Sequence, residues 1–134
     1  NYKIAILRLS NVYGNFNCLN DSTLIKKIIR YKMESLNNLN VKENRYSKKD
    51  YIHINDVVES IVNVILKIKN TDIFNLSFGK SYSLDEISRI LNLNIQTDES
   101  IEPSYSFISN DKIKKEFSLS FKHDFKSEVK KYDR

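Results

Sequence analysis

Glycine, proline and cysteine are scarce in this chain of 134 residues, which contains two glycines, one proline and one cysteine. A glycine-rich loop that wraps a phosphate needs several glycines within a few residues, so neither a dinucleotide-binding loop nor a P-loop is present. The single cysteine, Cys18, excludes an internal disulfide framework and is typical of a reducing compartment, which favours a cytoplasmic protein. It shares no recognisable zinc-site spacing with the two histidines, so we expect no metal.

The chain also lacks any apolar run near the roughly 20 residues that a membrane span requires. Its first residues carry neither the basic region nor the cleavage site of a signal peptide, so we expect no membrane partner. Hydrophobic residues make up 40% of the chain, as in globular rather than disordered proteins. The length suits one small domain or a part of a larger one.

Charge is not scarce, since the net charge is +5. A basic domain can bind nucleic acid or another polyanion. The lysines are nevertheless scattered among acidic residues, as in residues 112–116 (KIKKE), rather than gathered in one arm. We therefore favour a solvated basic surface and expect no nucleic-acid partner. The non-enzyme alternative is a stand-alone basic module that binds a polyanion through Lys48 and Lys49.

Predicted strands and helices alternate along the chain, which favours an α/β fold. Residues 3–9 form a nearly continuous apolar run, typical of a strand in a parallel sheet with both faces covered. Residues 10–15 follow as a loop at the carboxyl end of that strand, where open α/β sheets bind ligands. Asp21 and Ser22 can cap the next helix. Its predicted buried stripe consists of Leu24, Ile25, Ile28, Ile29, Met33 and Leu36.

The stretch at residues 48–58 changes from a strand pattern to a helix pattern in its middle. Residues 51–54 are aromatic and branched, which favours a strand. Asn55 or Asp56 is placed to cap the helix that follows. The core-facing residues predicted for this helix are Val57, Val58, Ile61, Val62, Ile65 and Leu66. We interpret Tyr51 as a packing residue and His53 as a satisfied strand histidine rather than a catalytic base.

Further elements are predicted towards the carboxyl terminus. Residues 73–78 indicate another strand, and Ser83 with Glu86 forms the capping box of a helix that follows. Short strands are expected at residues 39–41 and 94–97, and helices at residues 110–117 and 125–132.

Three segments of the chain carry recognisable motifs. Residues 7–14 are LRLSNVYG, residues 49–58 are KDYIHINDVV and residues 74–87 are FNLSFGKSYSLDEI. In this order they resemble the LRxxNVYGP, RDYIHVxDVV and yNlGsGkxxSlxEi blocks of extended short-chain dehydrogenase/reductases, the NAD-dependent nucleotide-sugar epimerase/dehydratase family. Residues 109–117 show a weaker similarity to the last segment of that family. Together the four segments span nearly the whole chain in compatible spacing.

The resemblance implies the carboxyl-terminal part of a Rossmann-type α/β enzyme, with one parallel strand plus a small mixed α/β substrate-binding domain. Residues 1–15 would be the last part of the Rossmann sheet and its loop, and residues 16–134 the substrate-binding subdomain. The NAD-binding domain would be absent. Because the first strand then lacks neighbours, we expect it at an exposed sheet edge or paired with another copy of the chain.

The resemblance also implies how the chemistry would be divided. The whole enzyme would oxidise and re-reduce the sugar through a nicotinamide, with a tyrosine of a Tyr-x-x-x-Lys pair as base. No tyrosine here has a lysine four residues later. The chain is therefore expected to contain no catalytic residue and to be inactive alone, as the substrate-binding half of its parent enzyme.

Site residues and ligands follow from the same resemblance. The cofactor would be NAD or NADP, bound mainly by the absent half, with Leu9 and Ser10 beside the nicotinamide ring. A nucleotide-sugar would be the substrate. The implied substrate contacts are Asn11, Asn20, Leu24 and Lys49. The parent protein would be a homodimer.

The chain departs from the family pattern at three places. Lys49 replaces an arginine that binds the pyrophosphate, so a point charge stands where the family has a planar fork. The acidic loop at residues 99–105 lacks a second arginine, and the hairpin at residues 42–45 lacks its glycine. The enzyme alternatives are a family reductase of a 4-keto sugar nucleotide or of another small carbonyl compound. Simpler structural roles are an Asx-turn for Asn11 and a solvated surface position for Lys49.

Overall fold

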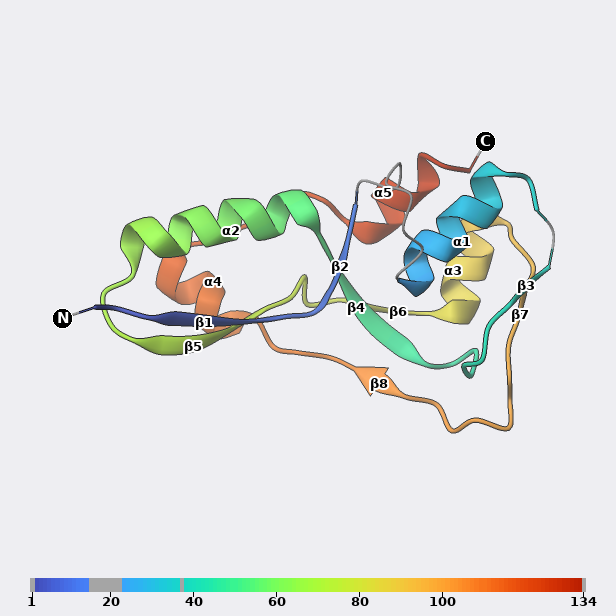
Figure 1. The fold of residues 1–134 in the computed structure, drawn as a ribbon, viewed down its shortest axis with the longest axis horizontal. Coiled ribbons are helices and arrows are strands. Elements are labelled where there is room, and N and C mark those ends of the chain that lie inside the picture. The colour runs from blue at the N-terminus through green and yellow to red at the C-terminus, as the bar shows by residue number, and fades with distance from the viewer. Residues whose placement is uncertain (1, 15–22, 37, 134) are drawn as a thin grey trace.

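The structure, a computed structural model, describes residues 2–14, 23–36 and 38–133 (Figure 1). Strands and helices alternate along most of the chain, which confirms the predicted α/β class. The elements are β1 Ala5–Leu9, β2 Asn11–Tyr13, α1 Leu24–Met33, β3 Leu39–Asn40, β4 Lys48–His53, α2 Ile54–Lys67, β5 Asp72–Leu76, β6 Ser81–Ser83, α3 Leu84–Leu91, β7 Ile95–Gln96, β8 Tyr105–Ser106, α4 Asp111–Phe117 and α5 Phe125–Lys130.

Strands β1 and β5 form a parallel pair at one end of the molecule, beside α2 and α4 (Figure 1). Ala5 and Leu7 pack against a core cluster that includes Phe74 and Phe117, whose rings meet edge to face at 5.0 Å. Residues of β1 that point the other way, such as Ile6, are exposed. Among the described strands β1 pairs only with β5, so its other edge is unpaired as predicted, while the described chain covers only one of its two faces. The pairing also adds a second parallel strand to the one predicted.

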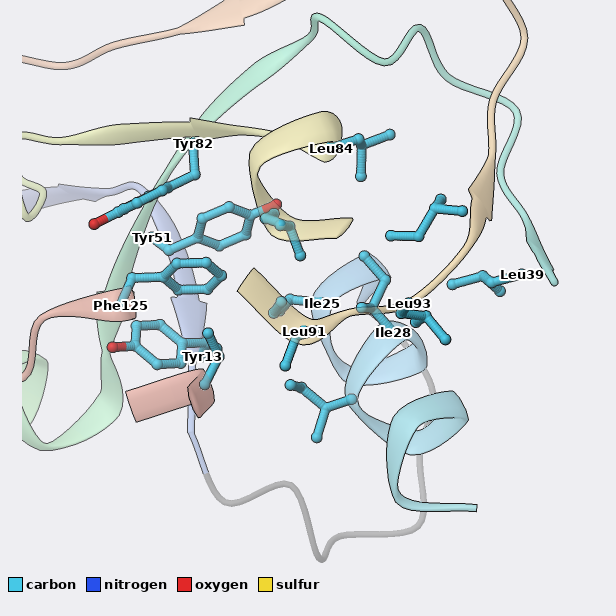
Figure 2. Packing of buried hydrophobic residues seen from close by; sticks show 14 residues of the cluster. Tyr13, Ile25, Ile28, Leu39, Tyr51, Tyr82, Leu84, Leu91, Leu93 and Phe125 are labelled. Carbon is cyan, nitrogen blue, oxygen red and sulfur yellow. The ribbon is translucent and has the colours of Figure 1, made fainter. Parts of the chain in front are cut away.

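A larger core lies at the other end, where β2, β4 and β6 form a sheet with β4 in its centre and β8 paired to β4. Helices α1, α3 and α5 pack there around buried aliphatic and aromatic side chains (Figure 2). Tyr51 stacks on Phe125 with ring centroids 4.5 Å apart. The predicted capping box is confirmed, because Ser83 and Glu86 bond each other's backbone N–H groups. Strands β3 and β7 form a short parallel pair behind these helices.

Helix α1 begins differently from its prediction. Its N-cap is Thr23, whose hydroxyl accepts a hydrogen bond from the N–H of Lys26, and the predicted caps Asp21 and Ser22 lie outside the described residues. A threonine hydroxyl just before the first helical residue can accept a hydrogen bond from an otherwise unpaired backbone N–H, as an aspartate or serine cap does. Ile25, Ile28 and Ile29 are buried as predicted. Met33 and Leu36 are exposed, because the buried stripe ends before the last turn of the helix.

Helix α2 shows the largest departure from prediction. It begins at Ile54, and its N-cap is His53 rather than Asn55 or Asp56. Val57 and Val64 are buried, together with the polar residues Asp56 and Ser60. The remaining members of the predicted apolar stripe are exposed, namely Val58, Ile61, Val62, Ile65 and Leu66. Leu66 is 76% exposed, so the apolar surface of this helix is wider than the surface that the described chain covers.

The carboxylate of Asp50, in the middle of β4, is fully buried. Its Oδ1 accepts a hydrogen bond from the N–H of Phe78 at 3.0 Å, and its Oδ2 accepts from Gly79 at 2.7 Å and Lys80 at 2.9 Å. Three backbone donors compensate for the burial of one negative charge. Gly79 has φ of +88°, a conformation open to glycine, which lets the loop between β5 and β6 wrap around the carboxylate.

Replacing Asp50 with asparagine is expected to lower the free energy of unfolding by about 3 kcal/mol. The amide carries no charge, and its NH₂ group would face the backbone N–H groups that donate to the carboxylate. Urea denaturation followed by circular dichroism measures the change. Asp98→Asn is the matched control, since Asp98 accepts its hydrogen bonds from the exposed Ser100 and should lose no measurable stability. An Asp50→Asn protein as stable as the unsubstituted chain would contradict the role of this clamp.

Candidate functional site

A cleft of about 400 Å³ opens between the start of α1 and the strands β2 and β4. Its lining residues are Asn11, Val12, Thr23, Leu24, Ile25, Lys49 and Tyr51. Three of the four predicted substrate contacts, Asn11, Leu24 and Lys49, are thus brought together. The fourth, Asn20, lies outside the described residues. A second hollow of about 430 Å³, lined by Lys32, Met33 and Lys131 among others, contains none of the predicted substrate or cofactor contacts.

Strand pairing explains why Asn11 and Lys49 meet. Strand β2 runs parallel to β4 with Asn11 opposite Tyr51. Lys49 lies two residues before Tyr51 and so points to the same face of β4. The Asn11 amide nitrogen donates to the backbone oxygen of Asp50 at 3.0 Å, which orients this side chain at the rim of the cleft.

The start of α1 makes its own contribution to the cleft. Thr23, Leu24 and Ile25 are the N-cap and first residues of this helix, and its first turn carries no acidic side chain. Backbone N–H groups at a helix N-terminus carry partial positive charge and suit anions. The cleft therefore combines a helix start, a lysine and an asparagine.

Lys49 is not a free cation in this cleft. Its Nζ contacts both carboxylate oxygens of Glu43, at 2.7 Å and 2.9 Å, and the two side chains are 30% and 16% exposed. In the sequence, residues 42–45 indicate only a hairpin without glycine, and Glu43 was not predicted as a partner of Lys49. The contact could not be predicted from helix or strand periodicity, because Glu43 and Lys49 lie on either side of a turn. The charge of Lys49 is thus compensated within the chain.

Leu9 and Ser10 lie where β1 ends. Leu9 is exposed, and the Ser10 N–H donates to the Leu76 oxygen at 3.0 Å. The Ser10 hydroxyl is buried without a hydrogen-bond partner among the described residues. The placement of Leu9 and Ser10 beside a nicotinamide ring stays a prediction.

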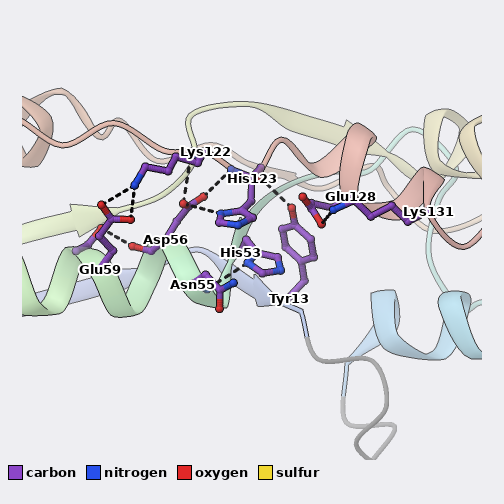
Figure 3. Close-up of polar contacts among 10 residues, drawn as sticks. Tyr13, His53, Asn55, Asp56, Glu59, Lys122, His123, Glu128 and Lys131 are labelled. Atoms are coloured by element: carbon purple, nitrogen blue, oxygen red, sulfur yellow. Dashed lines mark hydrogen bonds and ion pairs between the residues drawn. The ribbon is translucent and has the colours of Figure 1, made fainter.

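A histidine cluster lies at the junction of β4 and α2, next to Tyr13 (Figure 3). The His53 and His123 rings stack with centroids 4.4 Å apart. Asp56 is buried and accepts from the N–H groups of Lys122 and His123, both at 3.1 Å, and from the His123 ring at 2.9 Å. The prediction that Asp56 caps its own helix is wrong. Its carboxylate instead holds the carboxyl-terminal segment, which positions Phe125 against Tyr51.

The two histidines use the same ring nitrogen, Nδ1, in opposite roles. His53 Nδ1 accepts from the N–H of Asn55 at 3.2 Å, so its neutral ring carries the proton on Nε2. His123 must donate from Nδ1, because a carboxylate can only accept. The Cα of Gly14 lies close to His53, and a Cβ there would meet Nε2 at 2.9 Å. The interpretation of His53 as a satisfied histidine is supported, although it acts as a helix cap.

Charges and burial shift several pKa values in this region. Burial lowers the pKa of His53, and the neighbouring His123 lowers it further. Burial would raise the pKa of Asp56, but hydrogen bonds from the His123 ring and two backbone N–H groups bring it below its usual value. Burial raises the pKa of Tyr13 and of Tyr51, with the Glu43 charge adding to the effect on Tyr51. A phenolate base needs the opposite shift, so neither tyrosine suits general base catalysis.

The described part of the chain contains no group of three or more histidine, cysteine or acidic side chains arranged to hold a metal ion. In the same residues, no helix combines the length and the apolarity needed to cross a membrane.

The model of one protein family, NAD dependent epimerase/dehydratase, matches residues 1–77, more than half of the chain. The chain belongs to this family. No curated protein matches it. The matched residues include β2 and β4, which carry parts of two recognised motifs and line the cleft.

Solved structures show the fold of the family in this chain. RMD from Pseudomonas aeruginosa, in a complex with NADPH, is 16% identical with a TM-score of 0.83, and the match covers 98% of this chain and 47% of that one. UDP-N-acetylglucosamine 4-epimerase from Bacillus cereus is 18% identical with a TM-score of 0.79, covering 98% and 45%. dTDP-glucose 4,6-dehydratase from Bacillus anthracis, in a complex with NAD, is 19% identical with a TM-score of 0.77, covering 96% and 43%. This epimerase/dehydratase chain thus spans just under half the length of these structures.

Acidification is expected to destabilise the protein in two separate pH ranges. The fold favours neutral His53, so the unfolded chain gains the proton first and stability is lost as the pH falls through the ordinary histidine pKa of 6.5. The lowered pKa of Asp56 contributes stability above its ordinary value of 3.8, and that contribution is lost as the pH falls further.

His53→Asn separates these effects, because asparagine caps helices well but does not titrate. The loss of unfolding free energy between about pH 7.5 and 5.5 should be smaller in this variant than in the unsubstituted chain. Urea titrations at several pH values measure both slopes. Equal slopes in the two proteins would show that His53 does not govern the first range.

Proposed function

We propose that this chain is the substrate-binding half of an NAD(P)-dependent nucleotide-sugar epimerase/dehydratase. The observation that carries the proposal is the cleft in which Asn11, Leu24 and Lys49 meet. These residues come from three separate segments, and the resemblance to the family implies a substrate contact for each of them. In open α/β sheets, ligands bind at the carboxyl ends of the strands. Asn11 lies just beyond the carboxyl end of β1.

The cleft suits a diphosphate linked to less polar groups. The start of α1 offers backbone N–H groups and Lys49 offers an ammonium group, both favourable to phosphate oxygens. Leu24, Val12 and Ile25 supply an apolar wall for a base or sugar ring. A cleft of about 400 Å³ is within the usual size of small-molecule sites.

NAD or NADP fits the proposal as the cofactor, held mainly by protein outside this chain. When bound, a nicotinamide supplies the hydride acceptor and donor for oxidation and re-reduction of the sugar. The contribution of this chain is positional, with Leu9 and Ser10 beside the nicotinamide ring. Because the neighbouring tyrosines are buried and hard to ionise, the proton transfers belong to groups outside the chain.

The exposed apolar residues of α2 and β1 support a missing half. Ile65 and Leu66 are 70% and 76% exposed on α2, and Ile6 is exposed on β1, whose outer edge is unpaired among the described residues. Such a surface is typical of one that is covered in the working protein. We assign residues 1–15 to the end of a Rossmann sheet and residues 16–134 to the substrate subdomain, in a cytoplasmic, homodimeric parent enzyme.

The competing basic module is less well supported. Lys49, one of the two lysines on which it depends, is already paired with Glu43. A polyanion would therefore meet only one uncompensated lysine of the pair at this position, whereas nucleic-acid affinity rises with the number of phosphates that cations neutralise. No observation favours a reductase over an epimerase or dehydratase.

UDP and dTDP are expected to bind the chain weakly, and Lys49→Met should weaken binding about tenfold through the loss of a charge-assisted contact. Isothermal titration calorimetry measures both. Lys122→Met is the matched control, because Lys122 also contacts a glutamate, Glu59, at 2.9 Å and 3.0 Å but lies outside the cleft. If Lys49→Met and Lys122→Met bind UDP as the unsubstituted chain does, the proposed site is wrong.

A further inference from the structure

We propose that Glu43 sets the phosphate affinity of the cleft by competing with the ligand for Lys49. This inference rests on the proposed function and adds a specificity-determining residue to it. Glu43 holds the Lys49 ammonium with both carboxylate oxygens, at 2.7 Å and 2.9 Å. An ammonium group has three N–H bonds, so this pairing occupies most of its donor capacity.

The backbone holds both partners in place. Lys49 is locked into β4, where it pairs in register with Tyr82 of β6. The Glu43 carbonyl accepts the N–H of Asp98 at 3.0 Å, which ties the turn to the strand end beyond it. The two side chains therefore meet again whenever the cleft is empty, and a phosphate must compete with a preformed carboxylate rather than with water.

Partial burial makes this competition strong. Both side chains are less than one-third exposed, so solvent screens their attraction less than it would at the open surface. The carboxylate also repels a diphosphate directly, against the attraction of the α1 start. Glu43 thus favours ligands that gain additional contacts from a sugar or base over a bare diphosphate.

The contrast with the pair of Lys122 and Glu59 defines the control. That pair has nearly the same geometry, 2.9 Å and 3.0 Å, but its side chains are 61% and 50% exposed and lie outside the cleft. Glu43→Gln and Glu59→Gln therefore change the net charge equally, and only the first releases the cleft lysine.

Calorimetric titration with UDP tests the proposal on the unsubstituted chain, Glu43→Gln, Glu59→Gln, Lys49→Met and the double variant Glu43→Gln/Lys49→Met. We expect Glu43→Gln to bind UDP about tenfold more tightly, because a released ammonium gains a charge-assisted contact. Glu59→Gln should match the unsubstituted chain, and the double variant should show no gain over Lys49→Met. Far-UV circular dichroism and urea titration confirm that each variant is folded.

Two different failures can be told apart. If Lys49→Met weakens UDP binding but Glu43→Gln leaves it unchanged, the substrate site stands and the role of Glu43 is overturned. If Glu59→Gln tightens binding as much as Glu43→Gln, the effect is one of net charge, which also overturns it. If no variant binds UDP at millimolar concentration, both this inference and the proposed function of the cleft fail.

Discussion

The buried carboxylate of Asp50 is the interaction on which the rest of this structure depends. Three N–H groups of the loop between β5 and β6 converge on it, so the strand of one sheet is fastened to the central strand of the other. Its backbone oxygen also receives the Asn11 amide, and its neighbours Lys49 and Tyr51 line the cleft. One ionised group thus joins the two ends of the molecule and fixes the positions of the candidate ligand contacts.

Local patterns in the sequence predicted much of this arrangement. The capping box of Ser83 and Glu86 depends on residues three apart, and strand alternation around Tyr51 depends on residues two apart, so neither needs knowledge of the tertiary fold. The exposed face of α2 could not be predicted in this way. Helical periodicity identifies the apolar residues of a helix, but it does not say which part of the chain covers them, and here Leu66 remains exposed.

Polar contacts between distant residues account for the other differences. Asp56 was expected to cap its own helix, yet it binds the backbone at Lys122 and His123, more than sixty residues away. Asn11 and Lys49, which the motifs assign to the substrate, line one cleft. The contact of Glu43 with Lys49 was not predicted, because it depends on a turn that brings the carboxylate back to the strand. The sequence motifs therefore indicate residues of the cleft, whereas the compensation of the Lys49 charge by Glu43 is evident only from the three-dimensional structure.

We propose that the cleft between α1, β2 and β4 receives the diphosphate of a nucleotide-sugar. A crystal structure of the chain with UDP tests this most directly. We expect diphosphate density within hydrogen-bonding distance of Lys49 Nζ, beside the first residues of α1. Ordered UDP in the hollow of Lys32, Met33 and Lys131, with the cleft between α1, β2 and β4 empty, would contradict this proposal.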